Sequence, residues 1–160
     1  MNNPLRIGDS APDIAGLDQH GQPFSLSGHR GKPVVVFFYP KDHTPACTAQ
    51  SCGFRDAYEE FVAAGATVVG VSTGSVVGHA GFAVRHGLPF TLIADDGSIR
   101  AAWHVPKTLG LFPGRVTYVI DPQGRVCHVF NSQLRVGTHV QSALGVVKQL
   151  ALPPTSATPA

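Results

Sequence analysis

Two cysteines five positions apart, Cys47 and Cys52, are the residues of this 160-residue sequence best suited to covalent chemistry. Cys47 follows Thr44-Pro45, a pair typical of a helix start, because threonine is a favoured N-cap residue and proline in the first helical turn loses no hydrogen bond. Cys47 then lies in the first turn, where unpaired backbone N–H groups and the positive end of the helix dipole favour a thiolate. We expect a nucleophilic sulfur at Cys47, with the Thr44 hydroxyl as a donor to it.

Ionisation of this sulfur is not sufficient for fast catalysis. Converting an ordinary thiol fully to its thiolate at pH 7 raises the fraction of reactive thiolate about thirtyfold, which is equivalent to lowering a reaction barrier by only about 2 kcal/mol. A thiolate that attacks an O–O bond also needs donors that orient the peroxide and stabilise the departing oxyanion. Thr44 is one candidate donor, and a cation from elsewhere in the chain is expected as the second.

The spacing of Cys47 and Cys52 predicts a helix that must partly unwind. Five residues along an ideal helix correspond to a rise of about 7.5 Å and a rotation of about 140°, which separates the two Cα atoms by roughly 8–9 Å. A disulfide needs Cα atoms within about 7 Å of each other. The two sulfurs therefore cannot join while the helix is intact. Gly53 lowers the cost of unwinding, since glycine is about 1 kcal/mol less favourable than alanine inside a helix.

The remaining cysteine and the histidines give weaker signals. A C-x₄-C pair without a second pair of cysteines or histidines at a suitable spacing is a poor zinc site, so we expect no metal. Cys127 falls inside a predicted strand and is expected to be a small buried apolar residue. The eight histidines are scattered and are expected to be solvated or to cap helices: His20, His29, His43, His79, His86, His104, His128 and His139.

The elements that position these residues alternate between strands and helices. The run VVVFFY at 34–39 predicts a strand buried on both faces of a parallel sheet, and a helix from 45 continues through Val62 to a C-terminal Gly65. Further strands are predicted at 66–72, 90–94, 115–121 and 126–131, and helices at 75–86, 98–103 and 140–150. This order predicts an α/β fold, a central mixed β-sheet with helices on both faces. Ligands collect at the carboxyl ends of the parallel strands in such sheets, where 39–47 lies.

Length and composition predict one domain at 1–152, followed by a disordered Pro/Ser/Thr/Ala-rich tail at 153–160. Twelve Lys and Arg against ten Asp and Glu leave a formal net charge of +2, without the broad cationic face expected of a nucleic-acid binder. No apolar run is long enough to span a membrane or to act as a secretory signal. We therefore expect a cytoplasmic protein with reduced thiols.

The stretch FYPKDHTPACTAQSCGFRD at 38–56 resembles the active-site segment of peroxiredoxins, specifically the peroxiredoxin Q or bacterioferritin comigratory protein group. The peroxiredoxin signature Pro-x-x-x-Thr-x-x-Cys is met by Pro40, Thr44 and Cys47. The likeness continues through 70–95 and 114–126, which extends it over nearly the whole chain up to the last helix. The resemblance implies a thioredoxin-like fold with an N-terminal β-hairpin extension and no metal or organic cofactor.

Carried over by position, the resemblance implies a role for each of five residues. Cys47 is the peroxidatic residue, which hydrogen peroxide or a small organic hydroperoxide oxidises to a sulfenic acid. Pro40 shields the site from water, Thr44 bonds both the sulfur and the peroxide, and Arg115 supplies the cation. Cys52 is the resolving residue, and its disulfide with Cys47 is reduced by thioredoxin, glutaredoxin or a low-molecular-weight thiol. The group is often monomeric, and we expect a monomer here.

The sequence departs from the family pattern at two points. Ala46 precedes the reactive cysteine where the family commonly has glycine, a modest steric change. The predicted helix at 75–86 contains no cysteine, although some members place the resolving residue there, so resolution falls to Cys52 or to an outside thiol.

Two other functions are compatible with the same residues. A thiol–disulfide oxidoreductase would need C-x-x-C spacing, which the five-residue gap argues against. A redox-sensing or partner-binding module, in which oxidation of Cys47 changes the shape of the protein without turnover, could use the same unwinding helix.

Overall fold

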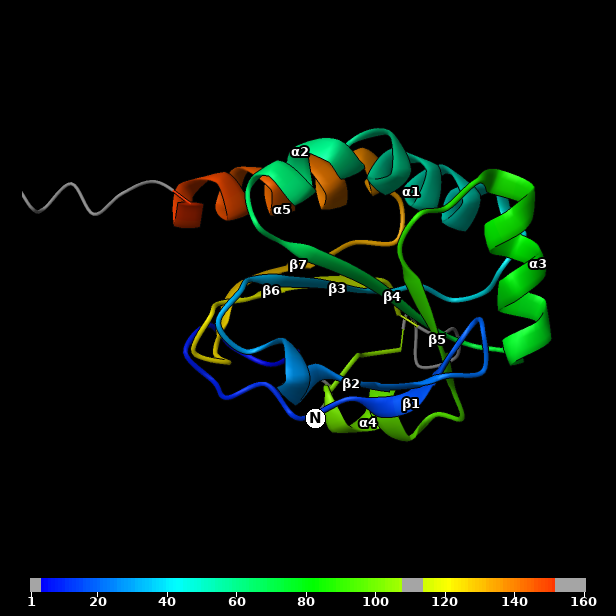
Figure 1. Cartoon of the computed structure of the whole chain (residues 1–160), viewed down its shortest axis with the longest axis horizontal. Coiled ribbons are helices and arrows are strands. Elements are labelled where there is room, and N and C mark those ends of the chain that lie inside the picture. Colours follow the sequence, from blue (N-terminus) through cyan, green and yellow to red (C-terminus); the bar gives the residue numbers. More distant parts are fainter. Residues whose placement is uncertain (1–3, 108–113, 152–160) are drawn as a thin grey trace, which may run out of the picture.

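The computed structural model describes residues 4–107 and 114–151, which fold as alternating strands and helices around one sheet (Figure 1). Their order along the chain is β1 (Ala15–Asp18), β2 (Pro23–Ser25), η1 (Leu26–His29), β3 (Val34–Phe38), α1 (Pro45–Asp56), α2 (Tyr58–Ala63), β4 (Thr67–Thr73), α3 (Val76–His86), β5 (Thr91–Asp95), α4 (Ser98–Ala102), β6 (Val116–Ile120), β7 (Val126–Asn131) and α5 (Val136–Ala151).

The seven strands lie in the order β2-β1-β5-β4-β3-β6-β7. Strands β3, β4 and β5 are parallel, whereas β6 and β7 continue the sheet in antiparallel fashion on one side. On the other side, the hairpin of β1 and β2 joins β5 through an antiparallel pairing. The predicted mixed sheet with its N-terminal hairpin is confirmed.

Each face of the sheet carries its own apolar cluster. Helices α1, α2, α3 and α5 cover one face, and α4 with the N-terminal segment covers the other (Figure 1). Along β3, Phe37 enters the first cluster, and its neighbours Val36 and Phe38 enter the second. All five residues of β3 are buried, which confirms the strand predicted to be covered on both faces.

Two helix boundaries differ from those predicted by more than one residue. The single helix expected to run from 45 to Val62 is interrupted at Ala57, whose φ of −95° and ψ of 3° end α1 and start α2. This bend lets Phe54 and Phe61 both be fully buried, with their ring centroids 5.7 Å apart. The last helix begins at Val136 rather than at 140, because His139 in its first turn binds β6 and the carbonyl oxygen of Ser132. Gly65, with a φ of +84°, follows α2 as predicted.

Other predictions concern residues that the structure does not describe. The tail at 153–160 lies outside the described residues, as does most of the loop at 106–114. The boundary of a single domain at 1–152 therefore stays a prediction.

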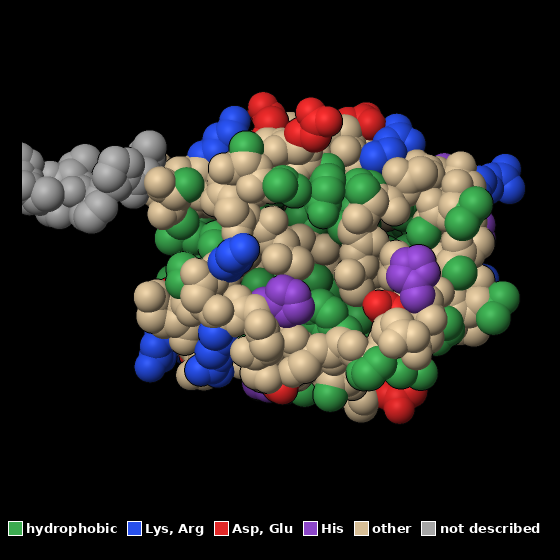
Figure 2. All heavy atoms as spheres, in the orientation of Figure 1, with side chains coloured by type: hydrophobic (Ala, Val, Ile, Leu, Met, Phe, Trp, Pro, Cys, Tyr) green, Lys and Arg blue, Asp and Glu red, His purple; other side chains and the backbone are tan. Residues whose placement is uncertain are grey.

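Charged side chains are thinly spread over the surface. Acidic side chains gather along the edge of the molecule where α1 and α2 lie (Figure 2), and Asp56, Glu59 and Glu60 of these helices are exposed. Lys and Arg are scattered on the face that Figure 2 shows rather than collected in one patch. Within 4–107 and 114–151, no helix has the length and apolar character needed to cross a membrane.

Candidate active site

The start of α1 places Cys47 in a buried position at the carboxyl end of β3. Thr44 has extended backbone angles and Pro45 is the first helical residue, as the sequence predicted. The carbonyl oxygen of Thr44 accepts the first helical bond, from the N–H of Thr48 at 2.8 Å, and Cys47 is fully buried one residue earlier. The thiol therefore lies in the first turn, at the positive end of the helix.

The Thr44 hydroxyl differs from its expected arrangement. It donates to the carbonyl oxygen of Lys41 at 3.2 Å instead of to the sulfur of Cys47. A carbonyl oxygen is a better acceptor than a thiol sulfur, and the tight turn before α1 brings that oxygen within reach. Thr44 lies three residues before Cys47, and rotation about its Cα–Cβ bond would turn the hydroxyl away from Lys41.

The structure places Arg115, the expected cation, beside Cys47. It directly precedes β6, whose Val116 pairs with Phe38, so the guanidinium lies at the end of β3 where α1 begins. Its Nη2 donates to Cys47 Sγ at 3.4 Å, and its Nη1 donates to Gln50 Oε1 at 2.6 Å. Its Nε donates to the carbonyl oxygen of Gln133 at 3.1 Å. With all three nitrogens bound, the buried guanidinium is fixed beside the sulfur and favours negative charge there.

Sequence reasoning missed the part that Gln50 plays in this arrangement. Gln50 follows Cys47 by one helical turn and is fully buried, and its Nε2 has no partner among the described residues. An amide donor without a partner, one turn from the sulfur, is available to a bound substrate oxygen. The i, i+3 spacing from Cys47 was the signal that could have identified it.

A second buried arginine, Arg100 of α4, joins the backbone segments that carry the site. Its Nη2 donates to the carbonyl oxygen of Tyr39, just before Pro40, at 3.0 Å. Its Nη1 donates at 3.4 Å to the carbonyl oxygen of Gly114, just before Arg115. Burial lowers the pKa of Arg100, while the charges of Asp95 and Cys47 act in the opposite direction. No sequence pattern pointed to this residue.

Aromatic side chains pack α1 against the sheet. Phe54 stacks on Phe37 of β3 with ring centroids 4.4 Å apart. Gly70 of β4 makes room for Phe37, because a Cβ at Gly70 would lie 2.8 Å from the ring. Directly before Phe54 in α1, Gly53 packs against Val140 of α5, where a Cβ would approach the valine Cγ2 to 3.0 Å. The helix that holds both cysteines is therefore fixed near its C-terminal end.

The three cysteines differ in their surroundings. All are free thiols, and Cys52 is half-buried on the intact helix α1 that also holds Cys47. Cys127 lies on β7, and burial, with a smaller contribution from Asp121, raises its pKa to about 11. A thiol with so high a pKa is almost entirely protonated at neutral pH and is a poor nucleophile. Cys127 therefore suits neither step of a thiolate reaction.

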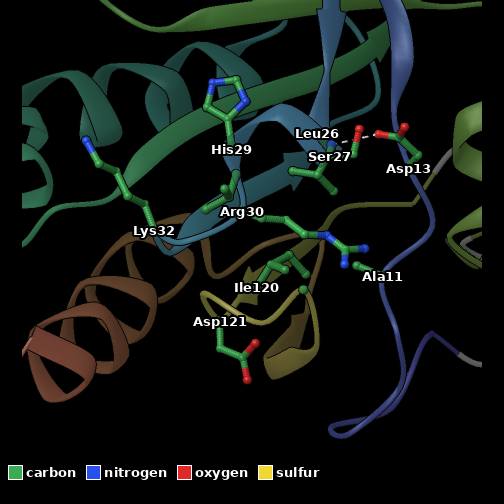
Figure 3. A pocket seen from close by; sticks show the side chains of 11 residues that line it. Ala11, Asp13, Leu26, Ser27, His29, Arg30, Lys32, Ile120 and Asp121 are labelled. Atoms are coloured by element: carbon green, nitrogen blue, oxygen red, sulfur yellow. Dashed lines mark hydrogen bonds between the residues drawn. The ribbon is translucent and has the colours of Figure 1, made fainter.

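An open hollow of about 800 Å³ adjoins the start of α1. Its walls come from the loop before α1, the start of α3 and the segment after β7, and include Pro40, Thr44, Thr73, Ser75, Gly78 and Gln133. A second hollow, between η1 and the β6–β7 turn, is lined by Asp13, Arg30 and Asp121, among others (Figure 3). Its volume of about 30 Å³ admits no more than one or two water molecules, so it is too small for an organic peroxide.

His139, buried behind Arg115, is held in its neutral form. Its Nε2 lies 2.7 Å from the carbonyl oxygen of Ser132, which can only accept, and its Nδ1 lies 2.8 Å from the hydroxyl of Thr117. Burial, with a smaller contribution from the Arg115 charge, lowers the pKa of His139 to about 4. A positive charge at His139 would therefore destabilise the region that holds Arg115.

The His139 environment predicts a loss of stability in mild acid. The unfolded chain binds a proton at this histidine near pH 6.5, but the folded protein does so only near pH 4. Above pH 6.5 the neutral His139 contributes to the free energy of unfolding, and this contribution is lost as pH falls to about 4. The free energy of unfolding should fall by about 3 kcal/mol for this reason. Urea unfolding at several pH values measures it, and His139→Gln, which cannot titrate, should show a flatter dependence below pH 6.5. Equal slopes for the two proteins would contradict this assignment.

Among the described residues, no group of three or more His, Cys, Asp or Glu side chains is placed to hold a metal ion. The chemistry available here is that of a buried sulfur, a fixed guanidinium and an amide donor without a partner. These groups could stabilise negative charge on sulfur and on the oxygens of a small bound substrate.

Comparison with known proteins decides the family. The family model described as "AhpC/TSA family" matches residues 7–129, which include both Cys47 and Arg115. The chain is a member of the AhpC/TSA family, the peroxiredoxins. Among curated relatives, the chloroplastic peroxiredoxin Q of Sedum lineare is 48% identical over 145 residues, which are 89% of this chain and 78% of that protein.

Solved structures place this peroxiredoxin in the same group. The peroxidoxin BcpB of Mycobacterium tuberculosis is 35% identical with a TM-score of 0.83, over 91% of this chain and 97% of that one. The bacterioferritin comigratory protein of Xanthomonas campestris is 31% identical with a TM-score of 0.82, over 92% of this chain and 98% of that one. The predicted resemblance to peroxiredoxin Q and the thioredoxin-like fold are confirmed, and this peroxiredoxin is a peroxidase.

Proposed function

We propose that this peroxiredoxin reduces hydrogen peroxide and organic hydroperoxides through Cys47 and Cys52, and that a thioredoxin-type dithiol regenerates it. The contact of 3.4 Å between Arg115 Nη2 and Cys47 Sγ, in the first turn of α1, is the observation that best supports this proposal. The guanidinium and the helix dipole both stabilise the thiolate, and the guanidinium is the cation that stabilises the oxyanion formed by O–O cleavage.

In the first step, the thiolate of Cys47 attacks one oxygen of the hydroperoxide. A sulfur–oxygen bond forms and the O–O bond breaks. An organic hydroperoxide releases an alkoxide, which takes a proton and leaves as an alcohol, and hydrogen peroxide releases a hydroxide, which leaves as water. Arg115 stabilises the developing oxyanion, and the Nε2 of Gln50 donates to a peroxide oxygen. The Thr44 hydroxyl turns from Lys41 toward the bound peroxide. The product at Cys47 is a sulfenic acid.

In the second step, the thiolate of Cys52 attacks the sulfur of the sulfenic acid, the sulfur–oxygen bond breaks, and the oxygen leaves as water. Because both residues lie on the intact helix α1, its first turns must unwind before the sulfurs meet. An external dithiol then reduces the Cys47–Cys52 disulfide and is itself oxidised. The family implies a thioredoxin-type reductant, and thioredoxin and glutaredoxin are the candidates.

The hollow beside α1 is the proposed route for the peroxide. Pro40 and Thr44 line it, while Cys47 itself is fully buried. Pro40, which carries no N–H group, helps to keep water from the sulfur. A small peroxide can reach Cys47 through slight movements of this loop, and a bulky alkyl group can remain in the hollow.

A coupled assay tests this function against the redox-sensing alternative. The protein is mixed with peroxide, thioredoxin, thioredoxin reductase and NADPH, and the loss of NADPH is followed. A steady rate proportional to protein concentration supports the enzyme. A single stoichiometric burst, followed by no further loss of NADPH, would instead indicate a sensor that is oxidised once.

Replacement of Cys52 by serine should uncouple the two steps. Cys52→Ser should consume one equivalent of peroxide at the parent rate, because the surroundings of Cys47 are unchanged, but it cannot form the disulfide. Mass spectrometry with a sulfenic-acid trap should find Cys47 as sulfenic acid and, with excess peroxide, as sulfinic acid. Normal cycling with thioredoxin and no over-oxidised product would show that Cys52 is not the resolving residue.

The cellular setting and assembly of this peroxiredoxin stay predictions. We propose a monomer that works in the cytoplasm without nucleic acid or membrane partners. The absence of metal and organic cofactors likewise stays a prediction, to be checked by activity after dialysis against a chelator. Several curated relatives carry the word chloroplastic in their names, which concerns those plant proteins.

A further inference from the structure

A buried charged cluster that the proposed mechanism does not use adjoins the loop before α1. His79 of α3 is fully buried, and its Nδ1 lies 2.6 Å from Asp42 Oδ2. The other carboxylate oxygen of Asp42 accepts from the hydroxyl of Tyr39 at 2.7 Å. His79 Nε2 lies 3.1 Å from the carbonyl oxygen of Ser72 on β4. One carboxylate of the loop is thus bound both to Tyr39, just after β3, and to α3.

The geometry around His79 favours its charged form. Both ring nitrogens face acceptors, and a neutral imidazole has only one N–H to donate. Burial by itself would lower the pKa of His79, but the hydrogen bond to Asp42 and the Asp42 charge outweigh it, so the pKa lies above its usual value. The other polar groups around it are Tyr39 just after β3, the Ser72 carbonyl of β4 and the backbone of Ile93 in β5.

The loop that Asp42 anchors is strained. His43, the next residue, has a φ of +65°, in the left-handed region that non-glycine residues rarely adopt. Lys41 and His43 are exposed, although the His43 ring lies edge-on to the ring of the buried Phe82, with centroids 5.1 Å apart. Such a conformation persists only where its surroundings hold it in place. Asp42 supplies the polar contacts of this loop to the buried side chains of Tyr39 and His79, so these contacts help to maintain it beside the ring contact of His43.

We propose that Asp42 and His79 are positioning residues, which hold the loop from Pro40 to Thr44 in the conformation that reacts with peroxide. Without this anchor, the strained backbone at His43 relaxes, and the first turn of α1 moves away from Arg115. Oxidation of Cys47 then becomes slower, while unwinding of α1 becomes easier and disulfide formation faster. The inference rests on the proposed function, since it concerns both steps of that reaction.

Two variants separate anchoring from charge. Asp42→Ala removes both contacts and should slow the oxidation of Cys47 by about 10- to 100-fold, as a displacement of about 1 Å in a reacting group does. In Asp42→Asn, the amide oxygen still accepts from Tyr39, and the amide nitrogen can donate to the Nδ1 of a neutral His79, whose Nε2–H donates to Ser72. Since this variant loses the charge and retains the anchor, it should react at close to the parent rate.

The measurement is a quench-flow experiment on the full chain, reduced and then mixed with hydrogen peroxide. Alkylation and mass spectrometry give two rates, for the oxidation of Cys47 and for formation of its disulfide with Cys52. In Asp42→Ala the first rate should fall and the second should rise. Val126→Ala, a buried substitution on β7, controls for general loss of stability and should leave both rates at parent values.

Two results would overturn the inference: parent-like oxidation of Asp42→Ala, or oxidation of Asp42→Asn as slow as that of Asp42→Ala. If Asp42→Ala does not fold, His79→Gln provides the same test from α3. The glutamine Nε2 can still donate to Ser72 while the contact with Asp42 is lost, so oxidation of Cys47 should again be slower, and a parent rate would overturn the inference. Failure of the proposed function is distinguishable, because the parent itself would then show no oxidation of Cys47.

Discussion

Cys47→Ser is expected to abolish peroxide consumption, reducing the rate to that of the uncatalysed reaction. A serine hydroxyl remains protonated at neutral pH even beside a guanidinium and a helix N-terminus, so no strong nucleophile is left for the O–O bond. The contacts of Arg115 with Gln50 and Gln133 should hold its guanidinium in place, so the variant should fold normally. A peroxide-sensitive dye assay with the reduced protein measures the residual rate.

Cys127→Ser is the matched control for this prediction. It also removes one thiol, but one whose pKa is raised to about 11, so only about one molecule in ten thousand carries a thiolate at pH 7. Peroxide consumption and cycling with thioredoxin should match the parent protein. The reverse pattern, with activity retained in Cys47→Ser and lost in Cys127→Ser, would show that the nucleophile has been assigned to the wrong cysteine.

Arg115→Met should slow the oxidation of Cys47 by about 10²- to 10³-fold, the effect of removing one preorganised donor from an oxyanion site. Methionine has a similar length but donates no hydrogen bond, so it leaves Cys47 and the Gln50 oxygen without their partner. Arg115→Lys should recover only part of the rate, because a single ammonium cannot bind Cys47, Gln50 and Gln133 in the planar arrangement of a guanidinium.

Stopped-flow kinetics with hydrogen peroxide measure this effect, with Arg135→Met as the control. Arg135 is exposed and lies over the ring of Phe130, 5.8 Å from its centroid, so its loss should leave the rate unchanged. If Arg115→Met reacts as fast as Arg135→Met, the contact of Arg115 with Cys47 does not accelerate the reaction.

The sequence was sufficient to predict the parts of the site that lie close together along the chain. The run at 34–39 predicted the central strand, and Thr44-Pro45 predicted the helix start that places Cys47 in its first turn. These features depend on local backbone preferences, which act within a few residues. Pro40, Thr44 and Cys47 match the peroxiredoxin signature, and this match predicted the family that the comparisons confirm.

Contacts between distant elements could not be predicted in the same way. The arginine that Gln50 binds and the tyrosine carbonyl that Arg100 binds become apparent only when the sheet is built, because each lies more than sixty residues away along the chain. His79 was expected to be solvated or to cap a helix, yet it is fully buried against Asp42. The bend at Ala57 has the same origin, since helical periodicity continues through it and only packing on the sheet interrupts it.

The pairing of β6 with β3 has a consequence for how this protein must fold. Thr117 contacts α5, and the neighbouring residues Val116 and Tyr118 face the opposite side of the sheet, so Arg115 shares the α1 side with Thr117. Because successive side chains of a strand alternate, a shift of one residue in this pairing would turn the guanidinium to the other side. Such a molecule could keep most of its backbone hydrogen bonds and still be inert toward peroxide. Catalytic rate is therefore a sensitive assay of correct strand alignment in refolded preparations.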